Sequence, residues 1–414
     1  MINQLHNFAR KTIPILKLEE FNWVVCVGVP WNPKYVYSIG NIVIELNRRE
    51  KKILWINPAL MFNKSYVGSH PINKTKKRRN IILRLFFEIK TYIFFFNKID
   101  DNFFLVTPFL LPVFREHYFY NINRLLLQVQ FLILRSVFRV NRYLLYTSGY
   151  YDAYIVINFA NYVYWIHHFP DIDSDNRNIN ESQRNHIFQI ENNLILSCDY
   201  VLASSQRIFD KIISRSLPSI KLKDKVILFP HGVDFYHFYN SKPVEKNQFI
   251  INRGKPVVGY FGSLTNANDQ DTYIALAKAG YNLLIIGDVL YDYSECKKFP
   301  NIIFTGGINY KDVPSYVKCM DVGIMSWKIS EHILNSNPKK TLEFLSCGIP
   351  VVSNPIPQLV HEFGDIIYYA KTPDEFVQKV DLALKENSEI KILERVNLAR
   401  QRDWGKKIDF LFNV

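Results

Sequence analysis

Short, nearly continuous apolar runs alternate with helical stretches along this chain of 414 residues. The run NWVVCVGVPW (22–31) is followed by a helical stretch at 36–49 and then by the run KILWINP (52–58). An uninterrupted apolar run between turn residues is typical of a buried parallel strand, and the intervening helices supply the crossovers. The alternation therefore predicts an α/β architecture with doubly wound parallel sheets.

The alternation occurs twice, which predicts two domains. In the first half we expect helices at 121–142 and 181–197 and further strands at 103–112, 151–165, 199–205 and 227–234. In the second half we expect strands at 256–262, 281–287, 301–307, 321–327 and 349–353. The polar segment between them, rich in Pro and Gly, is interpreted as a linker. The expected domains are 1–240 and 241–395, with a C-terminal helix at 396–414 that can pack back on the first domain.

The net charge of +13 is concentrated rather than spread. Residues 71–98 hold eight Lys or Arg and one acid, and residues 121–142 hold four Arg, no acid and an apolar face. Basic segments with aromatic residues suit an anionic membrane surface, at about 1 kcal/mol per basic residue. The alternative for each is a solvated basic rim. The proposed membrane contacts are Lys74, Lys76, Lys77, Arg78 and Arg79.

Other features bound the location and exclude some partners. The five cysteines are scattered and are expected to be reduced thiols of a cytosolic protein. The first twenty residues lack the pattern of a signal peptide. The uncharged run 153–170 carries too many polar residues for a spanning helix. No nucleic-acid-binding motif is present, so we expect a cytoplasmic protein that lies peripherally on the inner face of the membrane.

The segment SNPKKTLEFLSCGIPVVS (336–353) predicts a helix with marked ends. Asn337 suits the N-cap, Pro338 the first helical position and Gly348 the left-handed residue after the helix. Lys340 in the first turn can bind phosphate, and Glu343 on the same face can accept hydrogen bonds from sugar hydroxyls. The alternative is a surface pair between Lys340 and Glu343.

This segment resembles the P-x-K-x-x-E-[FY]-[LM]-x-x-G-x-P-V-V signature of GT-B glycosyltransferases, in the retaining, glycogen-synthase-like group (group 1, family 4-like). Four other segments resemble that family in the expected order: 191–205, 229–238, 257–264 and 301–325. The resemblance implies two Rossmann-like domains facing a cleft and transfer of a sugar from a nucleotide diphosphate to a hydroxyl acceptor. It implies no metal and no cofactor besides the donor. A lipid-linked glycan of surface polysaccharide synthesis is the expected acceptor.

Two departures from the family pattern leave an alternative open. Asn335 stands where the paired-acid motif has its first acid, eight residues before Glu343. The segment after the first strand of the second domain also lacks a basic residue that the family often has there. The alternative is therefore a GT-B protein that binds a sugar nucleotide, or an epimerase-like one, without transferase activity. An interaction protein that uses only its basic face is a third option.

The resemblance and the strand ends together suggest the other site residues. Gly262 and Ser263 are expected against the diphosphate, where the main chain must approach closely. Gly306 and the adjacent Gly307 are expected against the nucleobase. Trp327 can line the expected nucleobase pocket or pack in the core. With Asn335, Lys340 and Glu343, these residues form the expected donor site.

Catalytic groups are expected in WIHHFPDIDSD (165–175), at a strand end of the first domain. A transferase needs a base for the acceptor hydroxyl or a partner for the donor sugar. Asp171 is the preferred acid and His168 the preferred histidine, with Asp173 as a further candidate. The alternative is a solvated turn.

Overall fold

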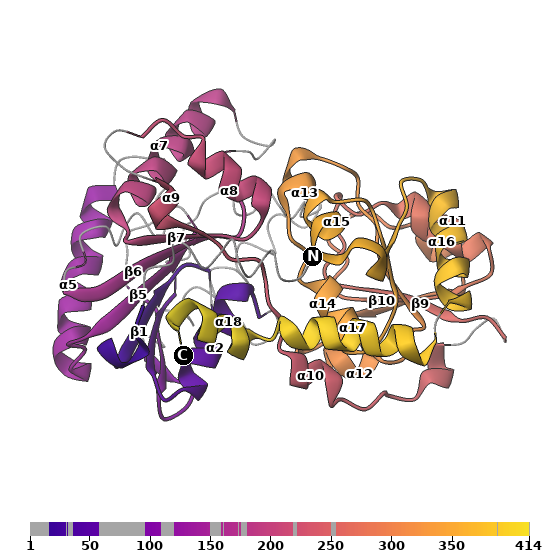
Figure 1. Ribbon diagram of the computed structural model, residues 1–414, viewed down its shortest axis with the longest axis horizontal. Coiled ribbons are helices and arrows are strands. Elements are labelled where there is room, and N and C mark those ends of the chain that lie inside the picture. The colour runs from indigo at the N-terminus through magenta and orange to yellow at the C-terminus, as the bar shows by residue number, and fades with distance from the viewer. Residues whose placement is uncertain are drawn as a thin grey trace, which may run out of the picture. The chain divides into compact units, whose positions relative to one another are not determined.

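The computed structural model describes residues 16–29, 31, 36–57, 96–108, 120–149, 159, 161–172, 174, 180–217, 222–249, 254–386 and 388–413 (Figure 1). The described residues form two compact units. The first contains those within 1–32, 37–230 and 408–414, and the second those within 33–36 and 231–407. The basic segment 71–98, with Lys74, Lys76, Lys77, Arg78 and Arg79, lies outside the described residues except for 96–98.

The first unit is built on an eight-stranded sheet in the order β3-β4-β2-β1-β5-β6-β7-β8. All neighbouring strands are parallel except β3, which runs antiparallel to β4 at the edge. The strands are β1 (Trp23–Val27), β2 (Lys52–Ile56), β3 (Phe96–Lys98), β4 (Phe103–Val106), β5 (Tyr143–Ser148), β6 (Tyr162–Phe169), β7 (Tyr200–Ala203) and β8 (Val226–Leu228). β1 is buried along its whole length, as its continuous apolar sequence predicts.

Helices cover the sheet of the first unit on both sides, and α2 and α5 lie on opposite sides of the strands in Figure 1. They are α2 (Ser38–Arg48), α5 (Tyr120–Phe138), α7 (Glu181–Ser197), α8 (Gln206–Ile213) and α9 (Leu222–Lys225). α7 begins with a capping box, in which Asn180 and Gln183 each accept a hydrogen bond from the other's backbone N–H. The helices expected at 36–49, 121–142 and 181–197 are therefore confirmed.

Several sequence expectations for this sheet need correction. The strand expected at 151–165 is β6, which starts only at Tyr162 and continues to Phe169; residues 151–158 lie outside the described residues. The edge strand β3 was not expected. Its three residues are all exposed, and the apolar run YIFFF at 92–96 ends on its first residue, Phe96. The strands expected at 103–112 and 227–234 are shorter than predicted, because β4 ends at Val106 and β8 at Leu228.

The second unit is built on a six-stranded, all-parallel sheet in the order β11-β10-β9-β12-β13-β14. Its strands are β9 (Val257–Phe261), β10 (Asn282–Ile286), β11 (Ile302–Gly306), β12 (Val322–Met325), β13 (Val351–Ser353) and β14 (Tyr368–Tyr369). The first five were expected. The chain leaves β9 toward β10 and β11 on one side and later returns to β12 on the other. A parallel sheet of this order binds ligands where the direction of winding changes, at the carboxyl ends of its central strands.

The second unit also holds residues that were expected in the first domain and in the C-terminal tail. Its helices are α10 (Phe235–Tyr239), α11 (Gln270–Lys278), α12 (Val313–Val317), α13 (Glu331–Asn335), α14 (Lys340–Ser346), α15 (Pro357–Phe363), α16 (Pro373–Lys385), α17 (Glu389–Gln401) and α18 (Trp404–Phe412). The unit begins at His231 rather than at 241, because Val233, Phe235 and Phe238 pack in its core. α18 starts in the second unit, and residues 408–413 belong to the first. No helix of the described ranges is long and apolar enough to span a bilayer.

A glycine in β12 decides how closely α14 approaches the second sheet. A Cβ atom on Gly323 would lie 2.6 Å from the ring of Phe344, which is fully buried in α14. The same ring packs edge-on against Phe261 at the end of β9, with 4.9 Å between the ring centroids. Any larger residue at position 323 would push the helix away from the strand ends.

We expect Gly323→Ala to destabilise the protein by about 1–3 kcal/mol, because the new methyl group overpacks this contact. Thermal or denaturant unfolding measures the loss. Phe344→Leu should relieve the overlap, so the double variant should lose at least about 1 kcal/mol less than the sum of the two single changes. Strict additivity of the two changes would contradict this packing argument.

Candidate functional site

α14 begins two residues later than the sequence pattern suggests. The N-cap residue is Lys339, which has a helical backbone conformation and makes no side-chain capping bond. The prediction of Asn337 as N-cap is therefore wrong. The Thr341 amide donates to the carbonyl of Pro338 at 3.2 Å, so a turn already forms before the helix proper. The other end is confirmed, since Gly348 has a φ of +75° after the helix.

Lys340 lies directly against the glycine that follows β9. A Cβ atom on Gly262 would lie 2.5 Å from Cε of Lys340 and 3.0 Å from its Nζ, and the φ of Gly262 is +124°. The ammonium is 5.9 Å from the centroid of the Tyr260 ring. No carboxylate of the described residues forms an ion pair with it. Lys340 thus places an uncompensated positive charge at the carboxyl end of the central strand.

The ends of β9, β10 and β11 converge beside this lysine through glycine main chain. A Cβ atom on Gly287 would lie 2.3 Å from the Gly262 carbonyl oxygen and 3.2 Å from the Ser263 amide nitrogen. The Gly287 amide donates to the Gly306 carbonyl at 2.9 Å. Gly306 has a φ of +73° and open space where a side chain would stand. The structure therefore brings Gly262, Ser263 and Gly306 together, as expected from the sequence.

Gly287 is a site residue that the sequence analysis missed. The signal was available, because the expected strand YNLLIIG ended on this glycine. A Cβ atom on Gly307 would come 2.6 Å from Oδ1 of Asp288. Gly262 and Gly306 are half-buried and have no side chain to stand between the main chain and a ligand, whereas Gly287 is buried.

Glu343 is buried, with 2% of its surface exposed, and only one of its oxygens is satisfied. Oε1 accepts a hydrogen bond from the Tyr310 hydroxyl at 3.1 Å and lies 3.4 Å from Nζ of Lys339. Oε2 is buried and has no hydrogen-bond donor among the residues that the structure describes. The ion-pair partner is thus Lys339 and not Lys340, so the surface pair considered as the alternative does not form. A buried carboxylate oxygen without a donor is costly and fits a site that a ligand completes.

Two neighbours hold the satisfied side of Glu343 in place, and sequence reasoning missed both. Nζ of Lys339 lies 5.1 Å from the centroid of the Tyr310 ring and donates to the Val36 carbonyl at 2.6 Å. The Tyr310 carbonyl lies 3.1 Å from Nε2 of His237. Tyr310 comes from the loop between β11 and α12, thirty-three positions before Glu343. No local pattern reveals a contact over that separation.

Trp327 and Asn335, two further expected site residues, lie after β12 and in α13. Trp327 follows β12, is half-buried, and its amide donates to Oδ1 of Asn354 at 2.7 Å. It packs against the core of the second unit, so both of its expected roles remain compatible with its position. Asn335 is the last residue of α13 and is buried.

The expected catalytic loop follows β6 in the first unit. Asp171 is half-buried just beyond the strand, and Asp173 lies outside the described residues. His168 is buried, with Nδ1 3.1 Å from the Tyr146 hydroxyl. Burial and the neighbouring His168 lower the pKa of His167 to about 3, so that ring is neutral at physiological pH. A catalytic role stays a prediction for Asp171, His168 and Asp173.

The segment that carries Asp171 is fixed by a fully buried carboxylate. Glu191 in α7 accepts hydrogen bonds from the amide of Ser174 at 3.1 Å and from its hydroxyl at 2.8 Å. Arg215 pairs with the same carboxylate at 2.6 Å. The Ser204 hydroxyl donates to the Pro170 carbonyl at 2.7 Å from the other side. The acidic and serine positions of the 191–205 segment thus hold the loop rather than face a ligand.

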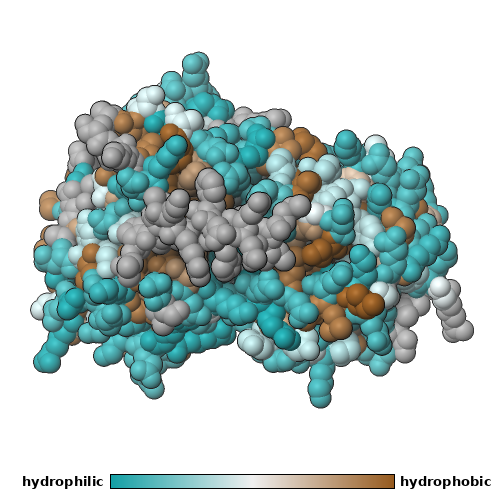
Figure 2. All heavy atoms as spheres, in the orientation of Figure 1, coloured by the Kyte–Doolittle hydropathy of each residue, from teal (hydrophilic) through white to brown (hydrophobic). Residues whose placement is uncertain are grey.

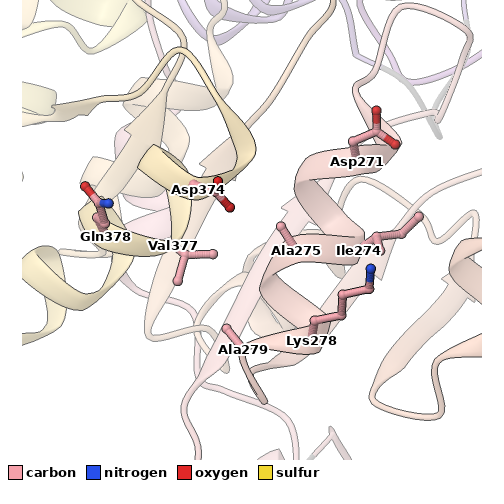
Figure 3. Close-up of a pocket in the computed structure, with 8 residues that line it drawn as sticks. All are labelled: Asp271, Ile274, Ala275, Lys278, Ala279, Asp374, Val377 and Gln378. Atoms are coloured by element: carbon pink, nitrogen blue, oxygen red, sulfur yellow. The ribbon is translucent and has the colours of Figure 1, made fainter.

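An open groove of about 740 Å³ lies elsewhere in the second unit, between α11 and α16 (Figure 3). Its lining residues are Asp271, Ile274, Ala275, Lys278, Ala279, Asp374, Val377 and Gln378. None of the expected site residues lines it.

The described residues also contain no cluster of three His, Cys, Asp or Glu side chains that could hold a metal ion.

Comparison with known proteins places these features in a family. Residues 255–386 match the family model of glycosyl transferases group 1. TuaH of Bacillus subtilis, described as a teichuronic acid biosynthesis glycosyltransferase, is 27% identical over 239 residues. A GDP-mannose-dependent alpha-mannosyltransferase of Mycobacterium tuberculosis is 28% identical over 160 residues. These matches cover 55% and 37% of this chain and span only 59% and 39% of the two relatives.

Solved structures extend the likeness to nearly the whole chain. HepE of Anabaena in complex with UDP and glucose matches with a TM-score of 0.61 at 15% identity, covering 94% of this chain and 98% of that one. Sucrose-phosphate synthase of Thermosynechococcus elongatus matches with a TM-score of 0.61 at 12% identity, covering 94% and 95%. The chain therefore has the GT-B fold of two Rossmann-like domains, and its residues 255–386 match the family model of glycosyl transferases group 1.

Proposed function

We propose that this protein is a glycosyltransferase that moves a sugar from a nucleotide diphosphate donor to a hydroxyl acceptor. The observation that carries the proposal is the pairing of two incomplete groups on one helix. Lys340 has an ammonium without an ion-pair partner among the described residues, and Glu343 has a buried oxygen without a donor. A diphosphate supplies the negative charge, and a ribose hydroxyl supplies the missing O–H donor. HepE, whose solved structure holds UDP and glucose, shares the fold.

The strand-end glycines give the diphosphate its place in this proposal. Gly262 and Gly306 carry no side chain beside Lys340, so phosphate oxygens can approach the ammonium and the Ser263 amide. The amides of Gly262 and Gly287 already donate to the carbonyls of Ile286 and Gly306. During transfer the bond from the sugar carbon to the phosphate oxygen breaks, and negative charge builds up on the leaving nucleoside diphosphate. Lys340 stabilises that charge, and the proposal assigns this role to no metal ion.

The acceptor side of the reaction belongs to the first unit in this proposal. The acceptor oxygen forms the new bond to the sugar carbon, and its proton passes to Asp171, with Asp173 and His168 as alternatives. The neutral ring of His167 is excluded as a proton carrier near neutral pH by its low pKa. Glu191 holds Ser174 and Ser204 holds the Pro170 carbonyl, so the chain on both sides of Asp171 is kept in position, which such a base requires.

We further propose a lipid-linked glycan as acceptor and a peripheral position on the cytoplasmic face of the membrane. TuaH is described by teichuronic acid biosynthesis and WaaG, a solved structure of TM-score 0.56 and 11% identity, by lipopolysaccharide biosynthesis. Teichuronic acid and lipopolysaccharide are both products of surface polysaccharide assembly. The net charge of +13 favours an anionic surface as the partner.

A binding protein or an epimerase without transferase activity is the second candidate. The observation that favours it is Asn335, a buried amide at the position of the family's first acid. The two candidates differ in what they release. A transferase produces free nucleoside diphosphate at a rate that rises with acceptor, an epimerase converts the sugar nucleotide, and a binding protein does neither.

Donor binding gives the first functional prediction. Lys340→Ala should weaken binding of a nucleoside diphosphate about 10- to 100-fold and leave binding of the nucleoside nearly unchanged, because its partner is phosphate. Glu343→Gln should weaken both, because ribose is common to them. Tyr310→Phe should weaken both by a smaller factor, since it removes only the bond that orients Oε1. Isothermal titration calorimetry measures all three.

A control in the same unit tests the site against the open groove. Lys278→Ala removes a lysine that lines the groove between α11 and α16, and it should leave nucleotide binding unchanged. If Lys278→Ala weakens binding while Lys340→Ala and Glu343→Gln do not, the donor site has been placed wrongly.

Catalysis gives a second prediction. Asp171→Asn should lower kcat about 10²- to 10⁴-fold with donor affinity unchanged, because an amide cannot take the acceptor proton. Steady-state kinetics with calorimetry separates the two effects. Full activity in this variant would move the role to Asp173 or His168, whose asparagine and alanine variants are the next measurements.

The basic segment gives a third prediction. Neutralising Lys76, Lys77, Arg78 and Arg79 removes four charges, worth roughly 4 kcal/mol at an anionic surface before screening by salt. Co-sedimentation with anionic vesicles should fall while nucleotide binding stays the same. Absence of vesicle binding by the unaltered protein would favour a soluble acceptor.

A further inference from the structure

α5 is apolar on both of its long faces. Its inner face packs Leu127, Phe131 and Leu134 into the core of the first unit. On its outer face six apolar side chains, the outer stripe, are between 46% and 69% exposed: Ile122, Leu125, Val129, Leu132, Ile133 and Val137. A helix on a protein surface normally carries polar residues there, and one that is apolar all round is normally covered.

The outer stripe runs the length of the helix in a nearly straight line. Apart from the adjacent pair Leu132 and Ile133, its members follow one another at intervals of three or four residues, so they lie on one face over about 22 Å. α5 lies at the outer edge of its unit, and brown atoms emerge at that edge of the surface in the same view (Figures 1 and 2). At the end of α5 the Phe96 ring, 43% exposed, stacks on Phe138 with 5.4 Å between centroids. The apolar surface therefore continues onto the edge strand β3.

The charges around the outer stripe indicate what covers it. Residues 120–142 contain four arginines and no acid. Arg139 and Arg142 are exposed just after the C-terminal end of α5. Among the side chains described within α5, Ser136 is the one exposed residue that is not apolar. A line of aliphatic residues bordered by arginines, without acids, complements the interface of a bilayer that contains anionic lipids. A protein partner would instead be expected to use aromatic anchors in pockets, and the exposed stripe has none.

We propose that the outer stripe of α5 docks the first unit on an anionic lipid surface, with its side chains in the interface and Arg139 and Arg142 at the headgroups. The proposal deepens the proposed function, on which it rests for the lipid-linked nature of the acceptor. The docking proposal differs from the proposed function in the surface that it assigns to the membrane, which is helix α5 and not the basic segment 71–98.

The test is binding to vesicles of phosphatidylcholine with about one third phosphatidylglycerol, compared with pure phosphatidylcholine. The triple variant Leu125→Gln, Leu132→Gln, Val137→Gln leaves the charge and the helix propensity nearly unchanged. It should bind at least about tenfold more weakly, since transferring one such side chain is already worth that factor. The double variant Arg139→Gln, Arg142→Gln should weaken binding to the anionic vesicles about tenfold and change binding to neutral ones little.

A matched control uses exposed apolar residues on another helix. Ile390 and Leu393 of α17 are 70% and 59% exposed, and changing both to Gln should leave vesicle binding unchanged. A loss in this control equal to that of the triple variant would overturn the proposal, because any exposed apolar residue would then serve.

Two further measurements distinguish the lipid proposal from its alternatives. One tests a second copy of the chain as the occupant of the outer stripe, and the other tests the proposed function independently. Sedimentation velocity tests a second copy of the chain: a dimer that the triple variant converts to a monomer, without vesicle binding by either form, overturns the lipid proposal. Calorimetry with a nucleoside diphosphate should give the same affinity for the triple variant and the unaltered protein. Suppose that neither the triple variant nor the unaltered protein binds nucleotide, while the unaltered protein alone binds vesicles. The proposed function then fails and the docking surface stands.

Discussion

The close approach of α14 to the ends of the second sheet is the contact on which the rest of the candidate site depends. Gly323 leaves room for the ring of Phe344, and Gly262 leaves room for the stem of Lys340. Both glycines act by what they lack, since a methyl group at either position would overlap a side chain of the helix. With the helix fixed at this depth, the ammonium of Lys340 and the carboxylate of Glu343 lie at the edge where β9, β10 and β11 end.

Two buried glutamates show how structure and binding can be told apart in this fold. Glu191 and Glu343 are both almost fully buried, and each has a cation nearby. Both oxygens of Glu191 receive protein donors, so its free energy of burial is already offset and it serves to hold a loop. Glu343 has donors on one oxygen only. The difference lies in hydrogen-bond satisfaction and not in burial, charge or residue type.

Much of this architecture could be predicted because the relevant signals are local. Continuous apolar runs predicted the central strands, and Gly348 marked the end of α14. The N-cap at Asn337 was wrong because Lys339 already adopts helical angles without a capping bond. The contact of Tyr310 with Glu343, and the choice of Lys339 over Lys340 as its ion partner, depend on loops that only the folded chain brings together. β3 escaped prediction because only its first residue belongs to the apolar run at 92–96 and all three of its residues are exposed.

The residues at the strand ends and those of the outer stripe occupy separate stretches of the sequence, 260–343 and 122–137. In evolutionary terms this separation makes the gene divisible. Recombination between related genes within the codons for 231–256 would exchange one stretch and keep the other intact. A lineage could then replace the residues at the strand ends while the outer stripe stays as it is, so the two stretches can evolve at different rates.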